Sequence, residues 1–525
     1  MAIPSNSKPT SLWRPLRSPT FRNLLFADVV SDIGAFMQGV GAAWLMVSLN
    51  SGPLYVALTT TASALPFFLL ALPAGAIGDI VDRRKVILFT EVWMVIVAII
   101  LTVLTIAGKM SPFLLLMLTF ALSAGDAFES PTWRAVLPEL VKKEDLSAAS
   151  ALNGIEFNFA RAVGPALGGL LIAIAGVGTA FLVNTLSFIG VIFVVARWKR
   201  PILKRTTPPE TVGGATIAAI RYVRYSPTIR IILLRAGVAV FFGSGLLALL
   251  PSVAHRAYDN PVGYGVLLGS FGCGGVLGAM AMQRARRHWS VDIVISAGIA
   301  ILGLTTIVTG LIRDLSILGL VMLIGGAGWI SFISLFNVQV LNQAPDWVRA
   351  RVLAFSLLVF QGSIAAGSAT WGALALRFGI GKTLMWAGIG AISTTLLGLF
   401  FHLPDSNVDL ASWNHWRLPL VLDSDFETTG PVLVTVQYHV DRDGVSEFLK
   451  TMRAYGRVKR RDGASRWGIC RDLENSDIYL ETFVVSSWAE HLRQHDRLTR
   501  ADREIEIKLH KYILNEPKVR HLLYL

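Results

Sequence analysis

Long apolar stretches recur along most of the chain, and each is long enough to cross a membrane. A hydrocarbon core about 30 Å thick requires about 20 residues of helix, and a helix satisfies its backbone hydrogen bonds without water. The pattern therefore predicts twelve membrane-spanning helices, near residues 22–48, 54–78, 86–108, 112–133, 149–173, 177–197, 229–250, 262–282, 291–311, 316–337, 350–376 and 383–403.

A polar segment at 199–228 divides these spans into two sets of six. It ends in an amphipathic stretch, TIAAIRYVRY (216–225), which we expect to lie on the inner membrane surface with its apolar side down. Short matches between the sets, such as GPALGG at 164–169 and GSATWG at 367–372, fit two repeated halves that meet at mid-membrane. We expect an all-α membrane protein with an N-terminal half at 1–198, a cytoplasmic central loop at 199–228 and a C-terminal half at 229–403.

The pattern changes at residue 404 to that of a water-soluble domain. After a linker at 404–429, alternating apolar residues predict strands at 431–440, 465–473, 477–485 and 519–525. Helical spacing at 445–460 and 487–513 predicts two helices. The order β-α-β-β-α-β is that of a ferredoxin-like fold, so we expect residues 430–525 to form a small cytoplasmic α+β domain.

Composition and charge agree with a membrane protein. Only 16% of residues are charged, against about a quarter in soluble proteins. Lysine and arginine gather in segments on one side of the predicted bundle, such as 83–85, 197–230 and 284–287, which places that side and both termini in the cytoplasm. The net charge of +13 comes from these loops and forms no continuous basic face, so nucleic acid is not an expected partner.

The loop between the second and third spans, GAIGDIVDRRK at 75–85, is a candidate gate. Gly75 allows close helix contact, and Asp79 can cap a helix or pair with a cation. Arg83 and Arg84 can bridge to the other half, so the loop would hold the halves together on the cytoplasmic side. The alternative is a plain basic topology signal, which leaves Gly75 and Asp79 unexplained.

The fifth span carries a glycine-rich segment, ARAVGPALGG at 160–169. Gly164, Gly168 and Gly169 would flatten one face of the helix for close packing, and Pro165 removes a backbone donor and kinks the helix. Ordinary packing of small residues accounts for this geometry as well as a role in gating does.

Acidic residues inside spans are costly and are therefore candidates for function. Asp28 and Asp32 lie four residues apart, on one face of the first span. A buried carboxyl group beside another tends to keep its proton, which suits a group that loads and unloads H⁺.

Other charged residues of the first half extend this set. Asp126 and Glu156 lie deep in their predicted spans, and Arg134 and Arg161 would tune the proton affinity of the carboxyl groups. Glu91 and Glu129, like Arg134, lie close to predicted span ends, where we expect side chains to face water. The second half has no comparably deep acidic residue, so any proton coupling should reside in the first half.

Aromatic and amide side chains are the expected lining of a substrate cavity, although such residues more often serve helix packing. As a set they suit a bulky amphipathic substrate better than a simple sugar. They are Phe36, Gln38, Trp44, Phe157, Asn158, Phe241, Trp329, Phe336, Asn337 and Gln361.

Several of these motifs resemble those of a known family. GAIGDIVDRRK resembles the signature loop of the major facilitator superfamily, although Ile80 stands where a basic residue is usual and Asp82 where glycine is usual. ARAVGPALGG is similar to the exporter-associated signature of that superfamily, with Ala160 for its first glycine. The stretch from FRNLLFADVVSDIGAFMQ to GWISFISLFNVQVLNQAP resembles the branch that contains the enterobactin exporter. This resemblance implies a bacterial inner-membrane protein that exports a siderophore, drug or related metabolite by proton antiport.

The C-terminal segment leaves more alternatives open. His491 and His495 are spaced to share a helix face, with His439 and His521 as possible neighbours, but without a third tightly spaced ligand a solvated helix is favoured over a metal site. The segment resembles dimeric α+β barrels, some of which are monooxygenases, and fold likeness alone does not give function. We expect no cofactor, no metal and no enzymatic activity. Dimerisation through this domain, uptake by symport, and a sensing or enzymatic tail remain alternatives.

Overall fold

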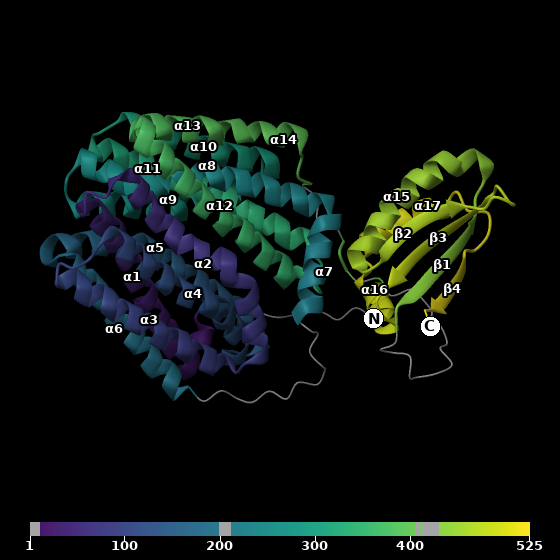
Figure 1. Ribbon diagram of the computed structural model, residues 1–525, viewed down its shortest axis with the longest axis horizontal. Helices are drawn as coiled ribbons and strands as arrows, with labels where there is room; N and C mark the ends of the chain where they lie inside the picture. The colour runs from purple at the N-terminus through teal and green to yellow at the C-terminus, as the bar shows by residue number, and fades with distance from the viewer. Residues whose placement is uncertain (1–10, 199–211, 405–408, 412, 414–429, 525) are drawn as a thin grey trace. The chain divides into compact units, whose positions relative to one another are not determined.

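The computed structural model describes residues 11–198, 212–404, 409–411, 413 and 430–524 (Figure 1). The side chains of residues 72, 75, 76, 78–80 and 212–216 lie outside this description. The described residues form two compact units. The first holds most of the long helices, and the second holds the described residues within 212–233, 337–356 and 403–524.

Within the described residues, twelve helical spans are long and apolar enough to cross a membrane, as the hydrophobic pattern predicts. The first six are α1 (Pro19–Ser48), α2 (Gly52–Ile80), α3 (Arg83–Ile106), α4 (Pro112–Leu140), α5 (Leu146–Ala175) and α6 (Val177–Arg197). The last six are α8 (Pro227–Ala257), α9 (Pro261–Ala285), α10 (Val291–Leu311), α11 (Leu315–Gln343), α12 (Arg349–Phe378) and α13 (Ile380–Ser393), the last continued by a 3₁₀ turn (Thr394–Leu396) and α14 (Leu397–Phe400).

Local signals set where several of these helices begin. Ser18, Ser111 and Asn260 each precede a proline, and each side chain accepts a hydrogen bond from a backbone N–H of the first turn. A proline at the first helical position costs no hydrogen bond, because its missing N–H would be unpaired there. A polar cap followed by proline therefore fixes the start of α1, α4 and α9.

Successive long helices run in opposite directions, so the bundle has two sides. We call the side with the α1–α2 loop (49–51) the first-loop side, and the side with the α2–α3 loop (81–82) the second-loop side. In the first half, α1 packs on α5 and α6, and α2 packs on α4. The contact of α5 with α9 joins the first half to the second.

The amphipathic stretch forms α7 (Val212–Tyr225). Its buried residues include Ala218 and Tyr222, whereas Ile217 and Ile220 are exposed. The Tyr222 hydroxyl donates a hydrogen bond to the carbonyl of Gln343, at 2.9 Å. The aromatic side of this helix is thus covered by protein, where the sequence predicts contact with the membrane surface.

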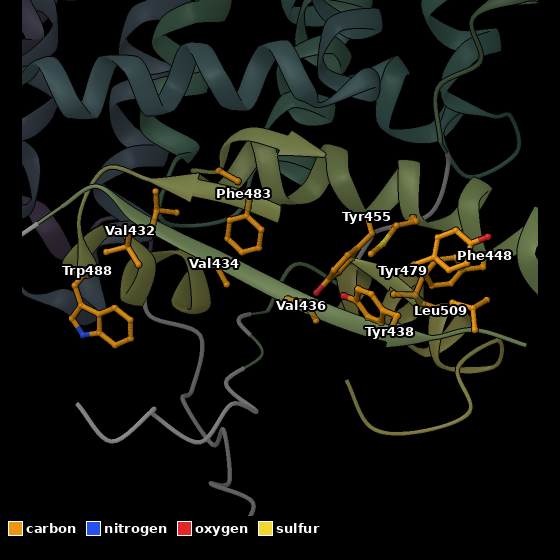
Figure 2. Packing of buried hydrophobic residues seen from close by; sticks show 14 residues of the cluster. Val432, Val434, Val436, Tyr438, Phe448, Tyr455, Tyr479, Phe483, Trp488 and Leu509 are labelled. Carbon is orange, nitrogen blue, oxygen red and sulfur yellow. The ribbon is translucent and has the colours of Figure 1, made fainter. Parts of the chain in front are cut away.

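The C-terminal segment has the predicted ferredoxin-like order. Its strands are β1 (Val432–His439), β2 (Ser465–Arg471), β3 (Ile478–Val485) and β4 (Lys518–Leu523), and its helices are α15 (Val445–Asp462), α16 (Trp488–Arg497) and α17 (Arg500–His510). The antiparallel sheet has the order β2-β3-β1-β4. Every second residue of β1, from Val432 to Tyr438, packs into one hydrophobic core with Phe448 and Tyr455 of α15 (Figure 2).

The prediction of one helix at 487–513 is wrong, because the chain breaks between α16 and α17. Thr499 has extended backbone angles and forms a capping box with Asp502. The Asp502 carboxylate accepts from the Thr499 N–H at 3.0 Å and from its hydroxyl at 2.7 Å. A threonine followed three residues later by aspartate starts a new helix, and this signal interrupts the helical spacing.

Candidate functional site

Six carboxyl groups come from the helices of the first half, and together we call them the acidic cluster. They come from helices that pack on one another, since α4 contacts both α1 and α3, and α1 contacts α5. The members are Asp28 and Asp32 on α1, Glu91 on α3, Asp126 and Glu129 on α4, and Glu156 on α5.

Asp28 is held by a tryptophan of a neighbouring helix. The indole N–H of Trp133 donates to Asp28 Oδ2 at 3.1 Å. Both residues line a small hollow within the first half, whose wall also includes Phe21, Ile87 and Trp198. This hollow lies toward the second-loop side, because Trp198 follows the end of α6 there. Asp28 therefore has a polar partner and an opening beside it.

Asp32 and Glu156 lie close enough across the α1–α5 contact to share a hydrogen bond when one of them carries a proton. Two carboxyl groups form such a bond only when one proton lies between them. Glu156 is 7% exposed, and its Oε1 has no hydrogen-bond partner within the described residues. The pair can therefore hold or release a proton, and release would leave two negative charges close together.

Glu91 and Glu129 do not face water, so that prediction is wrong. They are 2% and 8% exposed and form a hydrogen bond with each other. The hydroxyl of Thr90 donates to Glu129 Oε2 at 2.6 Å. The helices explain the error: α4 continues to Leu140, well beyond the predicted end at residue 133, so Glu129 lies inside the helix.

The predicted basic partners are not equally placed. Arg134 is exposed, as expected, and interacts electrostatically with Asp126, which is also exposed. Arg161 donates to Asn158 Oδ1 at 2.8 Å, and its guanidinium lies 5.9 Å from the centre of the Phe157 ring. Within the described residues, Arg161 thus contacts an amide and an aromatic ring of its own helix.

Part of the predicted cavity lining comes together beside the acidic cluster. The rings of Phe36 and Phe157 have their centres 5.8 Å apart. Phe36 lies one helical turn from Asp32, on the same face of α1, whereas Phe157 follows Glu156 in α5 and is 46% exposed. Asn158, one residue further along α5, is half-buried. The Phe36 ring, with Phe157 packed against it, is thus the aromatic group on the Asp32 face of α1.

Other predicted lining residues serve packing instead. Trp44, Trp329 and Phe336 are buried, at 7%, 7% and 4% exposed. Trp329 packs against three phenylalanine rings, and Trp44 against His255. A large apolar side chain gains most when it is removed from water, which explains why these aromatic groups fill helix contacts. Of the remaining residues, Phe241, Gln361 and Gln38 are half-buried, the last accepting a hydrogen bond from Asn184, and Asn337 is exposed.

Three glycines of α5 allow close approach of neighbouring helices, two of them of α1 and one of α9. A Cβ on Gly164 would lie 2.7 Å from Phe36 Cβ, and one on Gly168 would lie 2.9 Å from Met37 Cα, so both let α1 approach. A Cβ on Gly169 would lie 2.9 Å from Gly265 Cα on α9 and 2.8 Å from the Pro261 carbonyl oxygen. Gly169 therefore lets the two halves touch through backbone atoms.

A second pair of helices also joins the halves. The Thr61 hydroxyl on α2 donates to the Ala365 carbonyl on α12, at 3.1 Å. A Cβ on Gly372 would lie 2.6 Å from Ala57 Cβ. Residues 57 and 372 lie toward the first-loop side, as Gly169 and Gly265 do. The halves are thus in close contact on that side along α5–α9 and α2–α12.

The described contacts of the candidate gate differ from the expected bridge. Arg83 donates to Glu139 Oε1 at 2.8 Å and to the Ala135 carbonyl at 2.6 Å. Arg84 donates to the carbonyls of Val195, at 3.1 Å, and Ala196. These bonds tie α3 to α4 and α6, within the first half, and the Arg84 side chain reaches carbonyls of the last turn of α6.

The structure describes the side chains of only some residues of this loop. The backbones of Gly75 and Asp79 belong to α2, but their side chains lie outside the described residues. Asp82 caps α3 by accepting a hydrogen bond from the Arg84 N–H at 2.9 Å. In the sequence, this residue stands out only as a departure from the family pattern. An aspartate directly before a helical run is the signal that identifies such a cap.

Three histidines of the C-terminal domain form a row, in which His491 is buried and His495 and His521 are half-buried. His491 Nε2 lies 3.0 Å from His521 Nε2 and 3.1 Å from His495 Nε2, whereas His439 bonds Asn515 elsewhere. His491 is 2% exposed, so the expectation of a solvated helix face is wrong for this residue. In the described part of the chain, no group of three or more histidine, cysteine, aspartate or glutamate side chains has the geometry to hold a metal ion.

Burial controls the charge of these histidines. It lowers the pKa of His491 to about 3, helped by the neighbouring His495, His521 and Lys459. Burial and Lys459 lower the pKa of His495 to about 4. Burial also lowers the pKa of His521. All three are therefore neutral in the folded domain at neutral pH.

Comparison with known proteins agrees with a membrane transporter. Residues 10–525 match the family model described as transmembrane secretion effector. The chain is 24% identical over 383 residues to the staphyloferrin A transporter of Staphylococcus aureus (70% of this chain, 93% of that protein). It is 24% identical over 402 residues to the multidrug efflux pump Tap of Mycolicibacterium fortuitum (74% and 97%). It is 26% identical over 267 residues to the enterobactin exporter EntS of Salmonella choleraesuis (50% and 63%).

The fold also matches solved structures. A bacterial homologue of the human lysosomal transporter Spinster, in an inward-facing and unoccupied conformation, aligns with a TM-score of 0.58 at 14% identity. The alignment covers 75% of this chain and 96% of that one. At this identity the likeness concerns the fold alone. It agrees with the twelve-helix architecture and the two halves.

Proposed function

Because the chain belongs to the transmembrane secretion effector family of the major facilitator superfamily, we propose that it exports a small amphipathic molecule by proton-coupled antiport. A siderophore, a drug or a related metabolite is the substrate class, since similar proteins include a staphyloferrin A transporter, a multidrug efflux pump and an enterobactin exporter. Transport, and not catalysis, is the activity proposed.

The hydrogen bond that Asp32 and Glu156 can share is the observation that carries this proposal. The pair can hold one proton between its members, and Phe36, with Phe157 packed against it, lies on the Asp32 face of α1. When the proton leaves, two negative charges remain beside an aromatic surface, and an amphipathic molecule with a positive or hydrogen-donating group can compensate them. A proton and a substrate that compete for one place produce exchange, which is the requirement for antiport.

Asp28 and Asp126 extend the proton path within the acidic cluster. Asp28 interacts electrostatically with both Asp32 and Asp126, and it lines the hollow toward the second-loop side. We assign Arg134, beside Asp126, and Arg161, beside Phe157, to tuning the proton affinity and orienting the substrate. Protons would then pass between Asp32 and the second-loop side through Asp28.

Alternating access would come from rocking of the two halves about their shared contacts. The close approach through Gly169 and Gly265 supports closure on the first-loop side, and Gly164, Pro165 and Gly168 shape the same helix. We assign the opposite gate to the 75–85 loop, with Gly75, Asp79, Arg83 and Arg84. In the state that closes this gate, Arg83 and Arg84 would exchange partners from the first half for partners in the second.

The membrane setting completes the proposal. The distribution of lysine and arginine supports a bacterial inner membrane with both termini and the second-loop side in the cytoplasm. The C-terminal domain would then lie in the cytoplasm. Its sheet face opposite the helices carries half-buried Leu433 and Leu480, which supports dimerisation through this domain as a further possibility.

The test uses purified protein in liposomes with a pH-sensitive dye and an imposed proton gradient. Adding siderophores and amphipathic drugs to the wild type is expected to release protons only when a substrate is present. Asp32→Asn is expected to abolish that release while the protein stays folded in the membrane. Asp496→Asn, which changes an exposed aspartate of α16, serves as the matched control. Unchanged proton release in Asp32→Asn would remove this residue from the mechanism, and release coupled to substrate entry would indicate symport.

A further inference from the structure

The C-terminal domain contacts two short segments that adjoin membrane helices of the second half. One is α7, which leads through Ser226 into α8, and the other is the loop at 344–348 between α11 and α12. Both segments belong to the same compact unit as the domain. None of the proposed transport steps uses these contacts.

Glu490 is the centre of the polar part of this contact. Its Oε1 accepts from Arg221 of α7 at 3.0 Å and from Arg497 at 2.6 Å, and its Oε2 accepts from Arg493 at 3.0 Å. Glu490 is 8% exposed. A partly desolvated ion pair is screened less by solvent than an exposed one, so the bond to Arg221 matters more here than an exposed ion pair would, although Glu490 keeps Arg493 and Arg497 as partners.

Two aromatic rings form the apolar part. Tyr222 of α7 and Trp347 of the α11–α12 loop meet with ring centres 5.7 Å apart and nearly perpendicular planes. The Arg461 guanidinium lies 5.4 Å from the Tyr222 ring centre, and the Arg497 guanidinium lies 4.7 Å from that of Trp347. Arg461 thus covers the ring of Tyr222, and Arg497 covers that of Trp347. A cation over an aromatic face is held there by electrostatic attraction.

The two covering arginines are held in place by the domain itself. Arg461 forms ion pairs with Asp462 and Asp502, at 2.8 and 2.7 Å. Arg497 donates to the Asp462 carbonyl at 2.7 Å as well as to Glu490. Asp502 is in turn fixed by the capping box of α17. The contact surface is therefore ordered before it meets α7, which lowers the entropy lost on contact.

We propose that the C-terminal domain is a brace that holds α7 and the α11–α12 loop together as one rigid body. All of the contacted segments belong to the second half or its cytoplasmic extension, so the brace need not break when the halves rock against each other. A brace of this kind makes the ends of α8, α11 and α12 move together. Its loss would let these ends move separately, and rocking of the second half would become less efficient.

The test compares Arg221→Glu with Arg224→Glu in the purified full-length protein. Both substitutions lie on α7 and change the charge equally, but Arg224 is exposed and makes no ion pair within the described residues. Arg221→Glu places a like charge beside Glu490. Hydrogen exchange of the backbone amides at 218–223 and 343–348 is expected to accelerate about tenfold or more in Arg221→Glu and to stay at the wild-type rate in Arg224→Glu. Equal exchange in the two variants would show that the contact does not exist in solution.

Transport in liposomes supplies the second readout, and this arm alone rests on the proposed function. We expect the initial rate to fall about three- to tenfold in Arg221→Glu, with wild-type rates in Arg224→Glu. Trp347→Ala, which removes the other half of the contact, is expected to act in the same direction if Arg221→Glu fails to fold. Faster exchange with an unchanged transport rate would overturn the brace. Absence of transport in the wild type would contradict the proposed function, whereas the exchange measurement would still decide the contact.

Discussion

Trp133 on α4 donates its indole N–H to Asp28 on α1, and this bond joins two helices beside the acidic cluster. A single polar bond between helices in a membrane contributes modestly, typically less than about 2 kcal/mol. Its importance here is positional, because it fixes the one carboxyl group of the cluster that lines the hollow toward the second-loop side.

The first prediction concerns the indole N–H of Trp133, which donates to Asp28. Trp133→Phe keeps a ring in the hollow but leaves Asp28 without its indole partner, so we expect a loss of about 0.5–2 kcal/mol in stability and slower proton release. Trp198→Phe, in the wall of the same hollow, is the control, because no described hydrogen bond involves its indole. Thermal unfolding in detergent and the liposome assay measure the two effects. Equal stability of the two variants would contradict the role given to this bond.

The second prediction concerns the buried pair Glu91 and Glu129. Glu129→Gln keeps an acceptor for the Thr90 hydroxyl and a donor for Glu91, so we expect the folded protein to persist with less than about 1 kcal/mol of change. Glu129→Leu removes the acceptor and is expected to cost about 1–3 kcal/mol. Chemical denaturation of the two variants in the same detergent gives the comparison. A leucine variant as stable as the glutamine variant would show that the pair is not hydrogen-bonded.

The third prediction tests the backbone contact between the halves. Gly169→Ala places a Cβ against the Pro261 carbonyl and Gly265 Cα, which are backbone atoms and cannot rotate away. We expect the halves to separate there and transport to fall at least about tenfold, because a shift of about 1 Å disturbs a closed gate. Gly154→Ala, on the same helix with no atom within 4 Å of the added Cβ, is expected to be silent. Normal transport in Gly169→Ala would mean that the contact is not required for closure.

The fourth prediction concerns pH and the histidine row. Folding lowers the pKa of His491 to about 3 and that of His495 to about 4, from an ordinary value of 6.5. The unfolded chain therefore binds protons that the folded domain does not. The contribution of these histidines to the free energy of unfolding is fully present above pH 6.5. It is lost as the pH falls toward 4, by up to about 1.4 kcal/mol per pH unit for each histidine.

Urea unfolding of the fragment 430–525 between about pH 7.5 and about pH 5 measures this loss. The fragment has its own hydrophobic core (Figure 2). His491→Leu removes one titrating group and should make the stability less dependent on pH. A stability that stays constant down to about pH 5 would contradict the burial of these rings in solution.

Hydrophobic patterning was sufficient to predict the twelve spans and the ferredoxin-like order. The spans follow from the length of continuous apolar stretches, and the strands and helices of the C-terminal domain follow from periods of 2 and 3.6 residues. The patterning misjudged the ends of helices. Apolar length marks the part of α4 that suits lipid, but the helix continues through Arg134 and Glu139, since backbone hydrogen bonding does not require apolar side chains. The prediction that Glu129 faces water is therefore wrong, because Glu129 lies within the helix.

The interaction partners of the charged side chains were harder to predict than their positions along the helices. Asp28 and Asp32 are four residues apart, so their shared face follows from one helix, whereas the bond from Asp32 to Glu156 depends on how α1 meets α5. The destination of Arg83 likewise depends on where α4 ends. The polar pattern of its own helix predicts that His491 faces water, but β4 brings His521 against it. Contacts of this kind are set by tertiary packing, which single-helix patterns do not contain.

The contact of Gly169 with Gly265 is made by backbone atoms, and nothing in it can ionise. A seal built in this way keeps the same tightness whatever the acidity on either side of the membrane. The carboxyl groups of the cluster, by contrast, respond to acidity and take no part in that seal. In the proposed mechanism, protection against leak and sensitivity to the proton gradient therefore belong to separate parts of the chain, and mutation is expected to alter one without the other.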